Sequence, residues 1–250
     1  MNSLTKMNEK REGGFTLLEL LIVISIIAIL SIALVFMLNP AETLKKGRDA
    51  QRISDLKTVK TALGIMLTAS STPSLDNFGA ICLTSTTPAG VTTPNTSAKI
   101  SYSYDGTVTV AGTPTAGADA APEAAFGGVA GWSRVGASGA VSKVDGTGWI
   151  PVNLKALTGG TPISSFPVDP VNTVSSSIAA TNLVYRYACQ NGTGTGAGAG
   201  KPAYIFEIDA VLESNAYTSE DNKMAKDGGD NTGMYESGNS LNLLPISGAF

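Results

Sequence analysis

The clearest pattern in the chain is a long apolar run close to its N-terminus. It covers residues 15–38, contains a single charged residue, Glu19, and has neither glycine nor proline. About 20 such residues are enough for a helix to cross the hydrocarbon core of a bilayer. An ordinary secretory signal has a shorter apolar part, of about 7–15 residues. We therefore predict a membrane-spanning helix over 15–38.

A second helical pattern follows the apolar run. Asn39 and Pro40 predict a helix break and restart, with asparagine as the N-cap and proline as the first helical residue. Apolar side chains then recur every three to four positions, at Ile53, Leu56, Val59, Leu63 and Met66. The pattern predicts an amphipathic helix over 39–70, whose apolar stripe must pack against another part of the protein.

Residues 71–250 alternate between polar, glycine-rich stretches and short segments with the period-two pattern of strands. The segments predicted as strands are 99–104, 107–110, 148–154, 183–189 and 203–208. Asp105-Gly106 lies between the first two and predicts a tight hairpin turn. The expected fold is therefore α+β: a long N-terminal helix, with a transmembrane half and an amphipathic half, packed on a C-terminal antiparallel sheet.

Composition and charge exclude several classes of function. The chain has 17 basic and 20 acidic residues and a net charge of −3, which gives no reason to expect a nucleic-acid partner. It contains no histidine, and so lacks the usual general base and the usual zinc ligand. Ser-Lys and paired-carboxylate schemes remain, but the sequence places no such pair together. We do not expect an enzyme.

The two cysteines, Cys82 and Cys189, are far apart and form no CxxC motif. In an oxidising compartment they could pair, and closing so long a loop would stabilise the fold by about 4–5 kcal/mol on the chain-entropy model. Two buried free thiols are the alternative interpretation, because cysteine is also a common core residue.

Glu19 is unusual because an acid inside an apolar helix costs about 2.5–3.5 kcal/mol on insertion scales. One interpretation is that the side chain reaches the membrane interface from the first turn of the helix. The other is that it pairs with a cation. A cut after Gly14 would give Phe15 a protonated α-amine one helical turn away, and the amine of a neighbouring copy is a second candidate partner.

Residues 14–24, from Gly14 and Phe15 through Glu19 to Ile24, resemble the N-terminal signature of type IV pilins and type II secretion pseudopilins. The resemblance implies that prepilin peptidase removes residues 1–14 as a leader and that Phe15 is then N-methylated. It also implies that Glu19 neutralises the N-terminal amine of an adjacent subunit during filament assembly. One departure is that the apolar run lacks the helix-breaking proline common in type IV pilins, and Phe36 stands near that place.

The resemblance implies a structural filament subunit with a pilin-like fold. Expected partners are copies of the chain, other pilins or pseudopilins, prepilin peptidase and an inner-membrane assembly platform. The expected location is the cytoplasmic membrane, in a single pass with the N-terminus inside, and then a cell-surface filament. Basic residues alone would not choose this orientation, since more of them follow the span than precede it. The alternative is a membrane-tethered binding or adhesion module that does not polymerise.

Two stretches of the body extend the resemblance. Residues 167–170, Pro-Val-Asp-Pro, resemble a Pro-x-Asp-Pro stretch of pseudopilins, although both prolines would favour a rigid turn in any protein. Major pseudopilins carry a calcium loop near the C-terminus, and Asp227 and Asp230 lie at a similar position. The function requires no cofactor, and Asp227 and Asp230 are a candidate Ca²⁺ site. A solvated acidic turn is the alternative.

Overall fold

The structure is a computed structural model, and it describes residues 13–77, 81–82, 100–105, 109–110, 133–136, 139–174, 177–179, 181–191 and 203–244. The chain divides into two compact units, Met1–Leu44 and Lys45–Phe250. The tip of the predicted hairpin, residues 106–108, lies outside the described residues.

The first unit contains the apolar helix α1 (Leu17–Leu38) and the first turn of α2 (Pro40–Ala69). Asn39 separates the two helices with a left-handed backbone, φ 40°. The residue before a proline is disfavoured in helical geometry, and asparagine tolerates the left-handed region better than most residues. The carbonyl of Asn39 then accepts the amides of Glu42 and Thr43 at 3.0 and 3.2 Å, which opens α2. The helix therefore stops and restarts at the predicted place.

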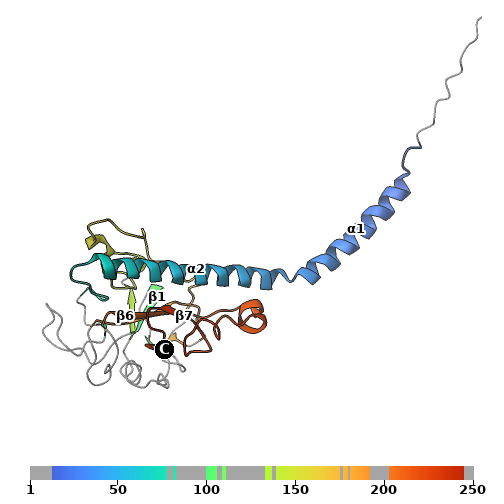
Figure 1. Ribbon diagram of the computed structural model, residues 1–250. Helices are drawn as coiled ribbons and strands as arrows, with labels where there is room; N and C mark the ends of the chain where they lie inside the picture. Colours follow the sequence, from blue (N-terminus) through green and yellow to red (C-terminus); the bar gives the residue numbers. More distant parts are fainter. Residues whose placement is uncertain are drawn as a thin grey trace, which may run out of the picture. The chain divides into compact units, whose positions relative to one another are not determined.

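The second unit is built around the remainder of α2, which lies along one face of a sheet (Figure 1). Most of the predicted apolar stripe is buried, and Ala62 belongs to it as well; Ile53 is only half-buried. The fully buried apolar residues of α2 are Leu56, Val59, Ala62, Leu63 and Met66. Burying one large aliphatic side chain contributes about 1.5–3 kcal/mol, so this stripe is a principal source of the packing energy that holds α2 on the sheet.

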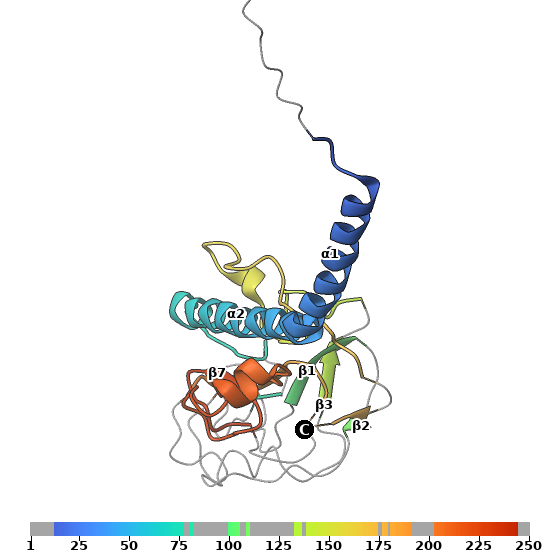
Figure 2. The same ribbon diagram turned by 90° about the vertical axis from the view of Figure 1, so that its right-hand side faces the viewer.

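The main sheet has five strands in the order β3-β1-β5-β6-β7. These are β3 (Ser133–Gly136), β1 (Ile100–Asp105), β5 (Arg186–Gln190), β6 (Ile205–Ala210) and β7 (Tyr235–Gly238). The pairs β1-β5, β5-β6 and β6-β7 are antiparallel, as predicted, whereas the edge strand β3 runs parallel to β1. Figure 2 shows β1 and β3 side by side. The α+β, pilin-like arrangement of helices and antiparallel sheet is confirmed.

Smaller elements complete the second unit. Two short strands, β2 (Thr109–Val110) and β4 (Ser177–Ile178), pair in parallel as a separate sheet. A 3-10 turn, η1 (Leu154–Ala156), and a five-residue π-helix, η3 (Ala216–Glu220), lie in the connections.

The predicted hairpin between 99–104 and 107–110 is wrong. The first segment forms β1, whose two edges are taken by β3 and β5, and the second forms β2, which pairs with β4. The Asp105-Gly106 turn signal is local. It is outweighed by pairing with strands distant in sequence, because packing against those strands dominates strand preference.

The predicted strand at 148–154 is also wrong, because the segment consists of bends leading into η1. Within it only Asn153 makes a bridge, to Asp145. A half-buried strand would place Trp149 and Ile150 on opposite faces, yet both are fully buried. The indole N–H of Trp149 donates to the carbonyl of Pro167 at 2.9 Å, so the segment folds over the core as an irregular cover.

The central strands have two buried faces of different chemistry. Phe206 and Ile208 of β6 pack in the core that contains the stripe of α2. Glu207 and Asp209 alternate with them and therefore point to the opposite face, and both are fully buried. Polar side chains are thus enclosed on the face that α2 does not cover.

A disulfide joins Cys82 to Cys189, with a Cα–Cα distance of 4.7 Å and a sequence separation of 107. Cys189 lies in β5, and both cysteines are fully buried. The carboxylate of Asp76 accepts the amides of Ile81 and Cys82 at 2.9 and 3.0 Å, which fixes the chain next to the bridge. The disulfide and Asp76 therefore tie the segment after α2 to the middle of the sheet.

Replacing both cysteines, as Cys82→Ala with Cys189→Ala, should lower the free energy of unfolding by about 2–5 kcal/mol, because the unfolded chain regains the entropy of an open loop. The measurement is urea unfolding of the full chain in mild detergent, followed by near-UV circular dichroism. A reductant should destabilise the wild type similarly and leave the double variant unchanged. Equal stability of the oxidised wild type and the double variant would contradict the prediction.

Candidate functional site

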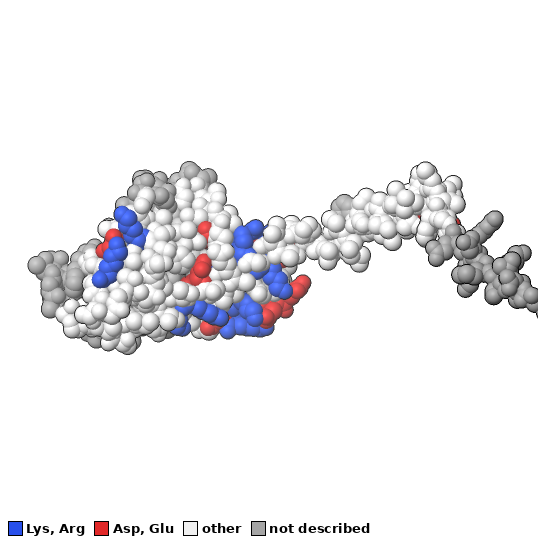
Figure 3. All heavy atoms as spheres, turned by 90° about the horizontal axis from the view of Figure 1, so that it is seen from above, with Lys and Arg blue, Asp and Glu red and all other residues white. Residues whose placement is uncertain are grey.

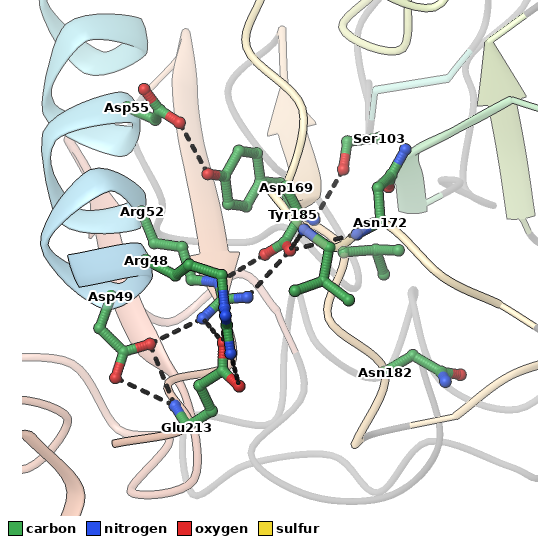
Figure 4. A network of polar contacts seen from close by, with 12 residues as sticks. Arg48, Asp49, Arg52, Asp55, Ser103, Asp169, Asn172, Asn182, Tyr185 and Glu213 are labelled. Carbon is green, nitrogen blue, oxygen red and sulfur yellow. Dashed lines mark hydrogen bonds and ion pairs between the residues drawn. The ribbon is translucent and has the colours of Figure 1, made fainter. Parts of the chain in front are cut away.

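A buried arginine connects α2 to two distant segments of the body (Figure 4). Arg52 donates to both carboxylate oxygens of Asp169, from Nε at 2.6 Å and from Nη2 at 3.0 Å. Its Nη1 donates to Asp49 at 2.7 Å and to Glu213 at 2.8 Å. The side chains of Arg52, Asp49 and Asp169 have no exposed surface. Two-pronged pairing of this kind fixes both the distance and the orientation of the partners.

The carboxylates around Arg52 are themselves anchored. Asp49 accepts the amide and the hydroxyl of Ser214 at 2.8 and 2.6 Å. Asp169, in the Pro-Val-Asp-Pro stretch, accepts the amide of Val171 at 2.8 Å, so this stretch supplies an acid as well as a turn. Arg48 adds a second positive charge by donating to both oxygens of Glu213, at 2.7 and 2.8 Å. Three carboxylates therefore face two guanidinium groups.

The charges of this network stabilise one another. Burial alone would lower the pKa of Arg52, but its hydrogen bonds and charge pairing with Asp169 outweigh burial and raise it. The hydrogen bonds from Arg48 lower the pKa of Glu213 to about 2, with a further contribution from Arg52. Arg48, Arg52 and Glu213 are therefore charged at neutral pH. The network acts as a clamp between α2, residues 167–170 and the segment after β6.

A second acidic group lies on the far face of the sheet and has a different environment. Glu207 and Asp209 of β6 and Glu236 of β7 are at most 2% exposed, and one carboxylate oxygen from each lies within 4.8 Å of the others. Asp209 is the register partner of both Arg186 in β5 and Glu236. We call Glu207, Asp209 and Glu236 the carboxylate triad.

Burial opposes ionisation of the triad. It raises the pKa of Glu207 and of Asp209 well above their ordinary values, and the neighbouring acids raise them further. Burial, with the adjacent Glu207, raises the pKa of Glu236 to about 11. Arg186 is also buried, and its positive charge partly offsets the rise in the pKa of Asp209. Its guanidinium donates to the carbonyls of Val184 and Ala179, at 3.1 and 3.0 Å.

Asp227 and Asp230, the predicted calcium ligands, lie in the loop before β7 and are half-buried. The two oxygens of Asp227 accept the amides of Gly229 and Glu236 at 3.0 and 2.8 Å. Asp227 therefore shapes the loop that delivers Glu236 to the triad. Calcium binding by Asp227 and Asp230 stays a prediction.

The N-terminal site is the region of the predicted cut. Residues 13–16 precede the helix, and Phe15 is 89% exposed. Thr16 is the N-cap of α1, and its hydroxyl accepts the amide of Glu19 at 3.2 Å. In return the Glu19 carboxylate accepts the amide and the hydroxyl of Thr16, at 2.8 and 2.9 Å. These reciprocal bonds are a capping box, which satisfies backbone donors that a helix start leaves free.

The helix behind this site is suited to a lipid environment. Leu17–Val35 is long and apolar enough to cross a membrane, and at about 1.5 Å per residue the 22-residue helix spans about 33 Å. The hydroxyls of Ser25 and Ser31 donate to the carbonyls of Leu21 and Ile27, each at 2.7 Å. On the face drawn in Figure 3, α1 presents no Lys or Arg. Its described side chains are exposed and need a cover of lipid or protein.

Comparison with known proteins places the decisive match at this end of the chain. Residues 10–35 match the prokaryotic N-terminal methylation motif, the cleavage and methylation signature of type IV pilins and pseudopilins. The chain carries a prepilin-type N-terminus. No curated protein matches it, and no solved structure does. The prepilin-type match supports a pilin-like or pseudopilin substrate of prepilin peptidase, and it includes Gly14, Phe15 and Glu19.

Sequence reasoning missed two features of these sites. The capping box could have been found, because Thr16 and Glu19 have the S/T-x-x-E spacing directly at the start of an apolar run. The triad gave a weaker signal: Glu207 lies in the predicted strand 203–208 but Asp209 lies just beyond its end. The two share a face only because β6 continues to Ala210. Glu236 could not be added, because β7 was not predicted.

Asp169→Asn should lower the free energy of unfolding by about 3–5 kcal/mol, because it leaves the buried Arg52 without its two-pronged partner. Asp145, which is only partly buried and pairs with the exposed Lys155 at 3.6 Å, provides a control, and Asp145→Asn should change stability far less. Both variants would be compared with the wild type by urea unfolding of the full chain in detergent. Similar losses in the two variants would contradict a special role for the Arg52 clamp.

Glu213 should make stability depend on pH at acidic values. Its pKa in the folded protein, about 2, lies below an unfolded value of about 4.3, so its contribution is complete above about pH 5 and is lost as pH falls towards 2. Glu213→Gln should cost about 1.5–3 kcal/mol at pH 7, the usual range for hydrogen bonds to charged groups. Unfolding measured from pH 7 to pH 2 should show this difference shrinking. A constant difference would exclude the charge as its cause.

Proposed function

We propose that the protein is the subunit of a type IV pilus-like or type II secretion pseudopilus filament. Prepilin peptidase cuts after Gly14, Phe15 becomes the methylated N-terminus, and α1 leaves the membrane to pack among copies of itself and related subunits. The observation that carries the proposal is the prepilin-type motif at residues 10–35 followed by an exposed apolar helix. The role is structural, and the chain is not an enzyme.

The exposed N-terminal segment supports the processing step. Residues 13–16 lie outside the helix, so a peptidase can reach the Gly14–Phe15 bond without unwinding α1. A side chain on Gly13 or Gly14 would meet nothing within 4 Å in this chain. Any requirement for glycine at the cut therefore comes from the peptidase.

The capping box supports a two-stage use of Glu19. Both Thr16 and Glu19 follow the cut, so the mature chain keeps the box. Before assembly, the bonds from Thr16 satisfy the Glu19 carboxylate within its own chain. In the filament, the protonated amine of a neighbouring Phe15 offers a full positive charge. A charged partner in apolar surroundings makes a stronger hydrogen bond than a neutral amide or hydroxyl. Docking then exchanges a weaker partner for a stronger one.

A matched pair of variants separates capping from charge pairing. Glutamine can replace glutamate in a capping box, so Glu19→Gln keeps the cap and removes the charge, whereas Thr16→Ala removes the cap and keeps the charge. We expect Glu19→Gln to be cleaved normally but to lose most of its surface filaments, and Thr16→Ala to assemble. The host should have a working prepilin peptidase and assembly platform, and the measurement is mass spectrometry of N-terminal peptides from sheared and membrane fractions.

The outcomes distinguish the alternatives. A peptide beginning at N-methylated Phe15 in sheared wild-type material is the expected result. An intact Met1 end, with no sheared material, would overturn the filament proposal and favour a membrane-tethered binding module. If Glu19→Gln assembled as well as the wild type while Thr16→Ala failed, Glu19 would serve the helix start and not the neighbouring subunit.

A further inference from the structure

The carboxylate triad has more acceptor oxygens than hydrogen bonds to satisfy them. Within the described part of the chain, no donor other than the carboxyl of another triad member reaches Oε1 of Glu207, Oε1 of Glu236 or either oxygen of Asp209. These residues are 0–2% exposed, so bulk water does not replace the missing donors. A buried charge without a partner is strongly destabilising, and natural folds keep one only when a proton, an ion pair or a metal offsets it.

Backbone amides hold two of the three acids in place. Oε2 of Glu207 accepts the amides of Leu243 and Leu244, the second at 2.9 Å. Oε2 of Glu236 accepts the amide of Asn231 at 3.0 Å. Each carboxylate therefore has one oxygen held by backbone amides and one oxygen left over. Asp209 lies between them in the strand register with both oxygens left over. This is how a preorganised ligand set is built.

We propose that Glu207, Asp209 and Glu236 bind one Ca²⁺ ion. The donor set contains only carboxylate oxygen, which suits hard cations. The chain has no histidine and its two cysteines form the disulfide, so the nitrogen and sulfur ligands that zinc and copper prefer are absent. Calcium–oxygen bonds of about 2.3–2.6 Å allow opposite ligands to be about 5 Å apart, which accommodates the 4.8 Å limit on the triad. Magnesium, at about 2.1 Å, would require contraction.

A pocket beside the triad offers a route for the ion. It is lined by residues 228–230 and 238–242. Gly229 lines this pocket and also contacts the triad, since a Cβ on this residue would lie 1.7 Å from Oε2 of Glu236. Glycine is therefore needed for the loop backbone to approach the carboxylate. The predicted ligand Asp230 lines the same pocket, whereas Asp227 is occupied by backbone amides.

The competing explanation is that the triad is neutralised by protons alone. The two explanations differ for Asp209→Asn, which removes one negative charge from a crowded site. With a calcium site, the wild type depends on Ca²⁺ for stability, and the variant loses that dependence. The variant should also be more stable than the wild type when both are calcium-free, because less charge is buried.

The test uses the full chain in mild detergent, stripped with EDTA and titrated with CaCl₂ by isothermal titration calorimetry and thermal unfolding. We expect about one Ca²⁺ per chain, a melting temperature that rises with Ca²⁺ concentration, and at least a tenfold loss of affinity in Asp209→Asn. Glu236→Gln is a second variant with the same expectation. The control is Asp221→Asn, because this acid pairs with Lys226 at 2.6 Å outside the triad, and it should bind like the wild type.

Three results would overturn the proposal. The first is a wild type that shows neither binding heat nor thermal stabilisation with millimolar CaCl₂. The second is an equal response from Asp209→Asn and Asp221→Asn. The third is an equal response of the wild type to MgCl₂, which would remove the case for calcium. The experiment does not involve the N-terminus, so its failure would leave the filament proposal untouched.

Discussion

The compact body depends on how a buried positive charge is held between α2 and the chain segments around it. Arg52 has no exposed surface, and its guanidinium reaches Asp49 on its own helix, Asp169 between η1 and β4, and Glu213 after β6. Arginine cannot lose its proton to escape burial. Each acid must therefore be in place when α2 packs. Apolar packing alone tolerates small shifts of the helix, whereas the directional bonds of Arg52 allow only one orientation.

The same body contains acids in two contrasting settings. Around Arg52, three carboxylates face two guanidinium groups, and the pKa of Glu213 falls to about 2. In the triad, burial and neighbouring acids act in the other direction, and the pKa of Glu236 rises to about 11. The difference lies in the number of donors and not in burial alone, since both groups are largely enclosed. The first setting completes itself within the chain, whereas we propose that the second is completed by a cation from solution.

Local patterns predicted the elements that depend on local chemistry. The apolar run, the restart at Asn39 and Pro40 and the stripe of α2 follow from residue type and helical spacing, and the structure has all three. Strands β5 and β6 were also expected, because aromatic and β-branched residues alternate in them. The predicted hairpin and the strand at 148–154 failed where the decisive partners are remote in sequence. β1 pairs with β3 and β5, and Trp149 bonds to Pro167. Asp169 was expected to form only a turn, since nothing near it in sequence reveals Arg52.

The two serines of α1 have a consequence for the energetics of moving that helix. Their hydroxyls donate to carbonyls one turn earlier, so neither hydroxyl proton needs a partner outside the helix. If α1 exchanges lipid for the interior of a protein assembly, as proposed, no hydrogen bond of Ser25 or Ser31 has to break. The lipid and the interior of the assembly are both apolar, so the hydrophobic effect largely cancels and contributes little to the free energy of transfer. The thermodynamic direction must then come from close side-chain contact and from the single charged group near the start of the helix.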